Sequence, residues 1–396
     1  MISIRDIRRA RPLRRRAGLL GTAVLATLTV TAAPAASAVH TAERHATASD
    51  SADVVQRGLD RLVGRYGFPA ALASVRGRDG GIRNHTAGVA DLRTKAAVPV
   101  DGYVRIGSNT KTYTAVLVLQ LVEEGKVKLD EPVETYLPGL IRGNGNDGRR
   151  ITVRQVLQHT SGLPNYTNIF AKGLEPHRHR YLQPLETLHI ALKEKRRFKP
   201  GTKWEYSNTN YTVAGLIVEK VTGRPYIEEL NRRIINRLGL RHTYLPNVGD
   251  QNVRAPHAKG YHADDPRRPL IEYTRSDPSF GWAAGAMIAR PSDVNRFFRA
   301  LLDGELLGEK ALKEMRRTVP APELGSGARY GLGIASYKLS CGVRAWGHGG
   351  DIPGYHTVNA ATDDGRAAIV AVTRLPRDLK EIEATQQVLD TALCRG

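Results

Sequence analysis

The apolar residues follow a strand-like pattern at both ends of the chain and a helical pattern between them. Residues 70–75 and 82–90 lie on either side of Asp79-Gly80-Gly81, which predicts two strands joined by a turn. From residue 109 to about residue 302 the apolar positions recur mostly at helical spacing. Gly223 and Gly239 are the expected helix ends there, and Pro291 is an expected helix start.

The C-terminal part returns to strands, followed by one more helix. The expected strands are residues 330–337, 343–346, 356–361 and 367–373, and the helix is residues 379–393. Strands at both ends with helices between them predict an α+β fold, in which an antiparallel sheet is flanked by helices and carries an inserted all-helical lobe. We expect one domain over residues 53–396, with an α/β lobe at about 53–105 and 283–396 and a helical lobe at about 106–282. A cleft would lie between the lobes.

The N-terminus predicts export. Seven arginines within the first 16 residues precede an apolar stretch at 17–30, and Ala36-Ser37-Ala38 supplies the small residues that a signal peptidase accepts. Residues 1–38 are therefore a predicted signal peptide, and residues 39–52 a predicted disordered linker. The mature protein would be secreted, extracellular or associated with the cell wall, with no stable membrane span; the export route, general or twin-arginine, is left open.

The charge remains strongly basic after removal of the signal peptide. Loss of seven arginines and one aspartate with residues 1–38 lowers the formal charge from +20 to +14. Such a surface can attract anionic cell-wall polymers, or it can be an arginine-rich exported surface with no particular ligand. Nucleic acid is not expected as a partner, because no block of like charges is interleaved with aromatic residues.

The two cysteines bear on the predicted location. An exported protein meets oxidising conditions, so Cys341 and Cys394 are expected to form a disulfide that ties the last helix to the strand region before His348. Two buried free thiols are the alternative.

The candidate nucleophile precedes a strongly apolar helical run. Ser108 and Lys111 are three residues apart at the head of the apolar run 112–122, so a helix would place their side chains on one face. A hydroxyl beside an amine is the minimum needed for a serine activated by lysine rather than by histidine. No other serine in the chain is followed by lysine three residues later.

Two further motifs are expected to meet this pair. Tyr206-Ser207-Asn208 follows a Pro-Gly pair and precedes the expected helix 211–221, so it should lie in a loop of the helical lobe. Tyr166-Thr167-Asn168 has the same pattern and is its rival. The segment 346–351, Trp-Gly-His-Gly-Gly-Asp, ends an expected strand, and its glycines permit close approach of the backbone to a ligand.

With Ser-x-x-Lys, Tyr-x-Asn and His-x-Gly in this order, the chain resembles the serine β-lactamase and penicillin-binding protein superfamily, in its class C β-lactamase and D-alanyl-D-alanine carboxypeptidase branch. The resemblance runs from about Asp53 to the C-terminus. Three stretches around the motifs support it: residues 152–163, 204–208 and 283–287.

The resemblance implies roles for the motif residues. Ser108 would attack a carbonyl and form an acyl-enzyme, while Lys111 and Tyr206 move its proton, which requires a neutral amine or a phenolate. The backbone N–H groups of Ser108 and Asp351 would form the oxyanion hole. Asn208 would hold a substrate amide. No cofactor and no metal are needed.

The remaining candidates are less firmly placed by the resemblance. His348 stands where relatives often carry lysine, and would add a hydrogen bond or a positive charge near Tyr206. Gly349, Gly350 and Asp351 would line the substrate site. Two aromatic residues are candidate cleft walls: Tyr166 and Trp282, the latter with a place in the core as the alternative. His159 is expected to be a structural residue at a helix end.

One departure from the family bears on the substrate. Carboxypeptidases similar to this chain place hydroxyl side chains beside the His-x-Gly glycine, where they help to grip a terminal carboxylate, whereas this chain has Gly349 and Asp351. Asp351 would repel such a carboxylate unless a neighbour such as Arg344 neutralised it or its side chain pointed away.

The sequence therefore predicts an exported serine hydrolase, first of all a D-alanyl-D-alanine carboxypeptidase acting on peptidoglycan-type peptides. An esterase or a D-amino-acid amidase or aminopeptidase of the same fold is the second hypothesis, and a penicillin-binding sensor with slow turnover is the third. The expected partners are small peptides or esters and β-lactams, and the protein is expected to be a monomer.

Overall fold

The computed structural model describes residues 48–395. The predicted signal peptide and residues 39–47 of the predicted linker lie outside the described residues. Residues 48–52 of that linker belong to the first helix, α1 (Ala48–Gly64), so the expectation of disorder is wrong for them. The helix continues through them because alanine is a strong helix former and neither glycine nor proline interrupts the segment.

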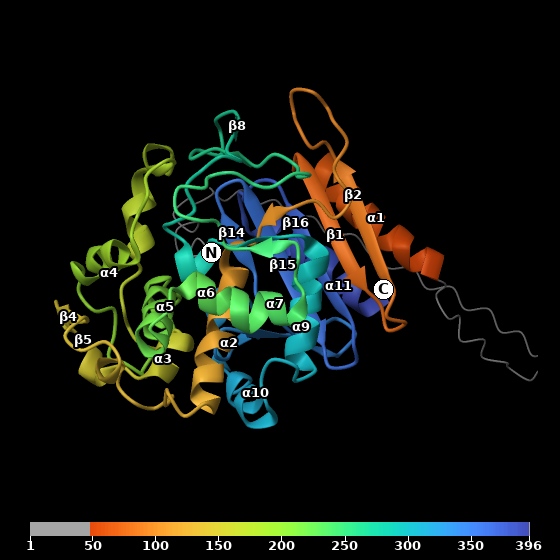
Figure 1. Ribbon diagram of the computed structural model, residues 1–396. Helices are drawn as coiled ribbons and strands as arrows, with labels where there is room; N and C mark the ends of the chain where they lie inside the picture. The colour runs from red at the N-terminus through yellow and green to blue at the C-terminus, as the bar shows by residue number, and fades with distance from the viewer. Residues whose placement is uncertain (1–47, 396) are drawn as a thin grey trace, which may run out of the picture.

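A nine-stranded antiparallel sheet forms the centre of the α/β lobe, as predicted (Figure 1). Its order is β10-β11-β12-β13-β15-β16-β1-β2, with β14 paired to β15 beside β13. The strands are β1 (Ala70–Arg76), β2 (Ile82–Gly88), β10 (Val319–Pro320), β11 (Arg329–Tyr330), β12 (Ala335–Lys338), β13 (Arg344–Gly347), β14 (Gly350–Ile352), β15 (Tyr355–Thr362) and β16 (Ala367–Val372).

The central strands are apolar on both faces because helices cover both. In β16, Ala368 and Val370 face one core cluster, while Ile369 and Ala371 face the other. This alternation follows the two-residue period of a strand. α1 and α11 (Leu379–Arg395) pack on the first face, and α9 (Pro291–Leu302) packs on the second.

The inserted lobe surrounds a buried helix, α2 (Thr110–Glu123), whose residues from Thr110 to Leu121 are all buried. A helix that is apolar on every side belongs in the interior. Gly223 and Gly239 adopt left-handed conformations at helix ends, as predicted. The other helices are α3 (Val153–Leu157), α4 (Pro184–Leu192), α5 (Thr209–Thr222), α6 (Tyr226–Leu230), α7 (Asn236–Leu238), α8 (Trp282–Gly285) and α10 (Glu309–Met315), the last of which lies after the lobe.

The inserted lobe is not purely helical, contrary to the prediction. Short strands lie within it because turn-forming glycine and asparagine residues interrupt the helical pattern, as in the Gly143-Asn144-Gly145 turn with positive φ at all three residues. These strands, with two that flank the lobe, are β3 (Val104–Arg105), β4 (Arg142–Gly143), β5 (Asn146–Asp147), β6 (Thr243–Tyr244), β7 (Tyr261–His262), β8 (Ile271–Glu272) and β9 (Ile288–Ala289).

The expected strand at 330–337 is two strands, β11 and β12. Gly331 and Gly333 break it because the backbone passes too close to its neighbours for a side chain. A Cβ on Gly331 would lie 2.1 Å from the Met315 carbonyl oxygen, and one on Gly333 would lie 2.4 Å from the Ala115 Cβ. This break brings the chain against α2.

The predicted disulfide joins Cys341 to Cys394 and so fixes α11 to the turn between β12 and β13. Within residues 48–395, every helix is too short or too polar to cross a lipid bilayer.

Candidate active site

The proposed nucleophile lies in the first turn of the buried helix. Ser108 belongs to a 3₁₀ turn, Gly107–Asn109, that leads directly into α2, and its side chain is almost fully buried. Gly107 has φ +49°, and a Cβ there would lie 2.9 Å from the backbone nitrogen of Asp351. Glycine at 107 therefore lets β14 approach the backbone beside Ser108.

Lys111 makes three close polar contacts. Its Nζ lies 2.6 Å from the carbonyl oxygen of Ala284, 2.7 Å from Asn208 Oδ1 and 3.0 Å from Ser108 Oγ. The first two atoms only accept hydrogen bonds, whereas a hydroxyl can also donate. A neutral amine would use its two N–H bonds on the two acceptors and turn its lone pair toward the Ser108 proton.

The electrostatics favour that neutral amine. Lys111 is completely buried, and burial lowers its pKa well below its ordinary value of 10.5, with the Asp351 carboxylate opposing part of the shift. Of the two options expected from the sequence, neutral amine or phenolate, the structure supports the amine at Lys111.

Tyr206 completes the trio. Its ring stands 4.9 Å from Lys111 Nζ, and its oxygen is buried with no hydrogen bond of normal geometry among the described residues. Burial raises the pKa of the Tyr206 phenol well above 10.0, Tyr330 raises it further, and only the nearby Ser108 hydroxyl lowers it appreciably. Tyr206 is therefore a protonated phenol beside the nucleophile, able to donate a proton to a bound substrate.

Asn208 accepts a hydrogen bond from Lys111, the proposed base. Its Oδ1 accepts the Lys111 hydrogen bond, while its backbone N–H donates to Asn165 Oδ1 at 3.1 Å. Sequence reasoning gave Asn208 a substrate contact, and the structure adds this contact with the lysine. It also brings in Asn165, which no motif indicated.

His159 packs against the loop that carries Tyr206. Its ring packs against the Tyr206 ring at 4.3 Å between centroids, and its Nδ1 accepts the Ser207 backbone N–H at 3.2 Å. Burial lowers the pKa of His159 well below 6.5, so the ring is neutral. These contacts agree with the predicted structural role.

His348 lies near the site, and of the two roles expected for it, a hydrogen bond or a positive charge, the structure does not support the charge. Burial, with Lys111 adding to it, lowers the pKa of His348 to about 3. Its Nδ1 donates to the Gly349 carbonyl oxygen at 2.6 Å, which leaves Nε2 to accept the Tyr330 hydroxyl at 2.9 Å. His348 is therefore a neutral link between Tyr330 and the turn before β14, and its ring centroid is 6.4 Å from that of Tyr206.

Gly349 and Gly350 were expected to line the substrate site, and Gly350 has a packing role as well. A Cβ on Gly350 would lie 2.0 Å from the Ile106 carbonyl oxygen and 2.7 Å from Thr357 Oγ1. Gly350 thus permits β14 to press against the segment that carries Ser108. Gly349 lines the cavity described below.

Asp351 has a neighbour that the sequence did not reveal. Its Oδ1 lies 2.5 Å from His356 Nδ1, across the antiparallel pairing of β14 with β15. His356 Nε2 lies 3.1 Å from Thr385 Oγ1, whose own proton is donated to the Ile382 carbonyl oxygen. His356 is thus held between Asp351 on β14 and Thr385 on α11.

Arg344, the neutralising neighbour suggested from the sequence, instead donates to Ser336 Oγ at 2.7 Å. His356 is the second residue of β15, just after the turn that follows β14. Its position opposite Asp351 follows from the register of these two strands.

Of the two proposed aromatic walls, Tyr166 is buried and Trp282 is half-buried. Tyr166 is 1% exposed, and its hydroxyl donates to the Phe280 carbonyl oxygen. Trp282 packs its ring on Tyr226 at 5.2 Å, against the large core cluster. Neither residue lines the cavity beside Tyr206, and Trp282 packs against the core, the alternative expected for it.

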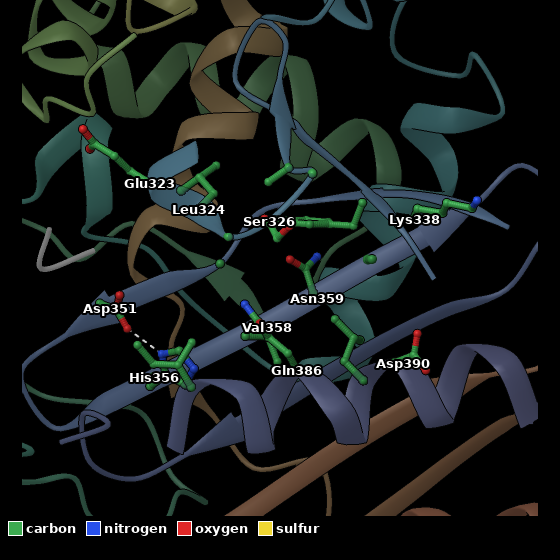
Figure 2. A pocket seen from close by; sticks show the side chains of 18 of the residues that line it. Glu323, Leu324, Ser326, Lys338, Asp351, His356, Val358, Asn359, Gln386 and Asp390 are labelled. Atoms are coloured by element: carbon green, nitrogen blue, oxygen red, sulfur yellow. Dashed lines mark hydrogen bonds and ion pairs between the residues drawn. The ribbon is translucent and has the colours of Figure 1, made fainter. Parts of the chain in front are cut away.

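A cavity of about 330 Å³ opens beside Tyr206, Gly349 and Asp351. Figure 2 shows it between the loop that carries Glu323 and Ser326, the strand β15 and the helix α11. The same view shows Asp351 and His356 joined at one end and Asp390 at the other.

A buried serine beside a lysine that can take its proton and a protonated tyrosine are the groups expected of a serine hydrolase. Residues 53–393 match the family model described as Beta-lactamase, and the chain therefore belongs to the beta-lactamase family.

Solved and curated proteins agree with this assignment. The chain is 40% identical to a D-stereospecific amidohydrolase from Streptomyces sp., with a TM-score of 0.77 over 84% of this chain and 98% of that one. It is 26% identical to the putative penicillin-binding protein PbpX of Bacillus subtilis over 69% of this chain and 63% of the relative. It is 25% identical to a D-aminopeptidase of Cereibacter sphaeroides over 81% of this chain and 59% of the relative. The chain thus spans less than two thirds of the length of both curated relatives.

Proposed function

We propose that this protein is an amidohydrolase that cleaves amides of D-amino acids whose leaving group carries no free carboxylate. The observation that carries the proposal is the position of Asp351. It belongs to β14, the strand that would hold the substrate, and its carboxylate lines the cavity. Two more carboxylates, Glu323 and Asp390, line the same cavity, and Lys338 is its only lysine or arginine among the described residues. A terminal carboxylate entering it would meet like charge.

The similarity to a D-stereospecific amidohydrolase and a D-aminopeptidase supports the same substrate class. The alternative predicted from the sequence, a D-alanyl-D-alanine carboxypeptidase, is supported by the penicillin-binding relative. It would require the Asp351–His356 pair to act as a neutral unit, so that His356 offsets the aspartate charge. Carboxypeptidase activity, export and the monomeric state stay predictions.

The chemistry follows from the contacts of the trio. Lys111 takes the Ser108 proton as Ser108 Oγ attacks the amide carbonyl, and Tyr206 gives its proton to the departing nitrogen. The proton on Lys111 then replaces the one lost by Tyr206. The Ser108 and Asp351 backbone N–H groups would stabilise the oxyanion, since Gly107 brings β14 against the backbone beside Ser108. Water releases the acyl group by the reverse proton transfers.

A substrate panel tests the proposal. Residues 39–396 are incubated with D-phenylalanine amide, L-phenylalanine amide, a D-alanyl-D-alanine peptide, a p-nitrophenyl ester and a chromogenic β-lactam. The proposal predicts the highest kcat/KM on the D-amide, with little release of D-alanine from the peptide. Faster release of D-alanine than of ammonia would establish the carboxypeptidase instead. Ester hydrolysis alone would indicate an esterase, and a lasting lactam adduct without turnover would indicate a sensor.

A further inference from the structure

The cavity beside Tyr206 extends well beyond the residues that perform the chemistry. From Tyr206 and Gly349 it runs beneath residues 323–328 and along β15 to the exposed face of α11, at Gln386 and Asp390 (Figure 2). Neither Ser108 nor Lys111 lines it. The cavity is therefore a continuation of the site rather than the site itself.

The position of the cavity indicates which part of a substrate enters it. Tyr206, at its mouth, is the proton donor to the departing nitrogen in the proposed mechanism. Asn208, which accepts a hydrogen bond from Lys111, does not line the cavity, although its partner Asn165 does. A group bonded to the departing nitrogen would thus pass Tyr206 and continue into the cavity.

The cavity walls are mainly apolar. The apolar side chains that line it come from the 323–328 loop, from β12 and its following turn, from β15 and from α11: Leu324, Tyr337, Leu339, Val358, Ile382 and Leu389. Walls of this kind favour an apolar body in the ligand.

One buried polar group lacks a partner there. Asn359 is 2% exposed; its Oδ1 accepts the His348 backbone N–H at 3.2 Å, while its Nδ2 makes no hydrogen bond among the described residues. Figure 2 shows the Asn359 side chain between the loop that carries Ser326 and helix α11. An unpaired buried N–H₂ costs stability unless a ligand satisfies it.

We propose that this cavity is a leaving-group subsite for an uncharged, largely apolar group that carries one hydrogen-bond acceptor, such as a blocked amino-acid residue. The inference rests on the proposed function for the direction of the scissile bond. It adds that the enzyme distinguishes amides by the group attached to the departing nitrogen.

The chain offers a matched pair of variants for the test. Gln386 and Gln387 are adjacent and exposed on α11, but only Gln386 lines the cavity. Gln386→Trp should obstruct the cavity, while Gln387→Trp adds the same side chain outside it. Neither residue contacts the catalytic trio, so both variants should fold.

The measurement is kcat/KM for D-alanine amide, whose leaving group is ammonia, and for D-alanine p-nitroanilide, whose leaving group is large and carries an acceptor. Gln386→Trp should lower the value for the anilide by about ten-fold and leave the amide within about two-fold. Gln387→Trp should change neither. Equal effects of the two variants, or an equal loss of kcat/KM on both substrates, would overturn the proposal of a leaving-group subsite.

Asn359→Asp separates the polar contact from the apolar walls, because it keeps the acceptor for His348 and removes the unpaired donor. Turnover of D-alanyl-glycine amide, which has a carbonyl beyond the scissile bond, should fall by about ten-fold more than that of D-alanine anilide, which has none. An equal fall would remove Asn359 from the proposal.

Failure of the proposed function can be recognised separately. The methyl and benzyl esters of D-alanine carry the same small and large leaving groups without an amide bond. If no amide is hydrolysed, the amidase proposal fails, and the esters still show whether Gln386→Trp selectively impairs the larger leaving group.

Discussion

The two sides of the site differ in the backbone elements that carry their polar groups. On the helical side, Lys111 reaches Ser108, Asn208 and Ala284 at hydrogen-bonding distance, and every one of these residues is held by a helix or by the turn that begins one. On the sheet side, β14 is a short strand paired only to β15, and the cavity beside it contains the unpaired amide of Asn359 among the described residues. The helical side therefore holds the proton-transfer groups in place, and the sheet side offers a polar group that a ligand could bind.

This difference separates chemistry from specificity. The proton-transfer groups must be fixed before the substrate arrives, because misplacement by an ångström is costly in rate. Recognition of the substrate needs a cavity and unsatisfied polar groups that the substrate completes. Variants on the two sides should therefore fail in different ways.

The largest expected effect is that of Lys111→Met, which keeps the volume of the helical side and removes its base. We expect kcat/KM to fall by about a thousand-fold on every substrate, since proton removal from Ser108 would have no acceptor. Steady-state kinetics on an amide and an ester measure this. A loss of kcat/KM confined to one substrate class would mean that Lys111 acts in substrate recognition rather than as the base.

The next effect compares the two Tyr-x-Asn motifs. Tyr206→Phe should lower kcat/KM by about a hundred-fold with little change in stability, because the Tyr206 oxygen has no normal hydrogen bond to lose among the described residues. Tyr166→Phe should leave kcat/KM within about two-fold and lower the free energy of unfolding by about 1–3 kcal/mol, because it leaves the Phe280 carbonyl without its donor. Urea unfolding and kinetics on both variants check the pair, and the reverse pattern would exchange the roles of the two tyrosines.

A smaller effect is expected on the sheet side from His356→Gln. Loss of the ring removes the His356 contact of the Asp351 carboxylate, so we expect KM for a carboxylate-bearing peptide to rise about ten-fold while KM for a neutral amide changes by about two-fold. The kcat for the amide should stay within about two-fold. An equal change in KM for both substrates would mean that His356 only supports the strand.

The smallest effect concerns stability and pH. The unfolded chain binds a proton at Lys111 below pH 10.5 that the native protein, with its lowered pKa, does not bind. Lys111 should therefore make the free energy of unfolding rise with pH between its native pKa and 10.5, by at most about 1.4 kcal/mol per pH unit. This contribution should be absent from Lys111→Met. Matching slopes in the two proteins would show that the native amine is protonated.

The helical side could be predicted from the sequence because each of its residues belongs to a local motif. Ser108 and Lys111 are one turn apart on one helix, and Tyr206 immediately precedes another. The main sheet could also be predicted, since its short apolar runs and the turns between them are local signals. The break at Gly331 and Gly333 could not, because it depends on contacts with Met315 and Ala115 far away in the sequence.

The sheet side was only partly predictable for the same reason. His356 pairs with Asp351 through strand register, and Tyr330 determines the protonation pattern of His348 from a different strand. The burial of Tyr166 and the packing of Trp282 against the core likewise result from tertiary contacts that a motif does not encode.

The most direct test of the central claim is the location of the acyl group. The protein and Ser108→Ala are each exposed to a β-lactam, and intact mass followed by peptide mapping locates any adduct. The account predicts one adduct per chain on the peptide that contains Ser108, and none on the variant, which should fold normally because it loses only a small hydroxyl. An adduct that persists on Ser108→Ala, or that maps to another residue, would contradict it.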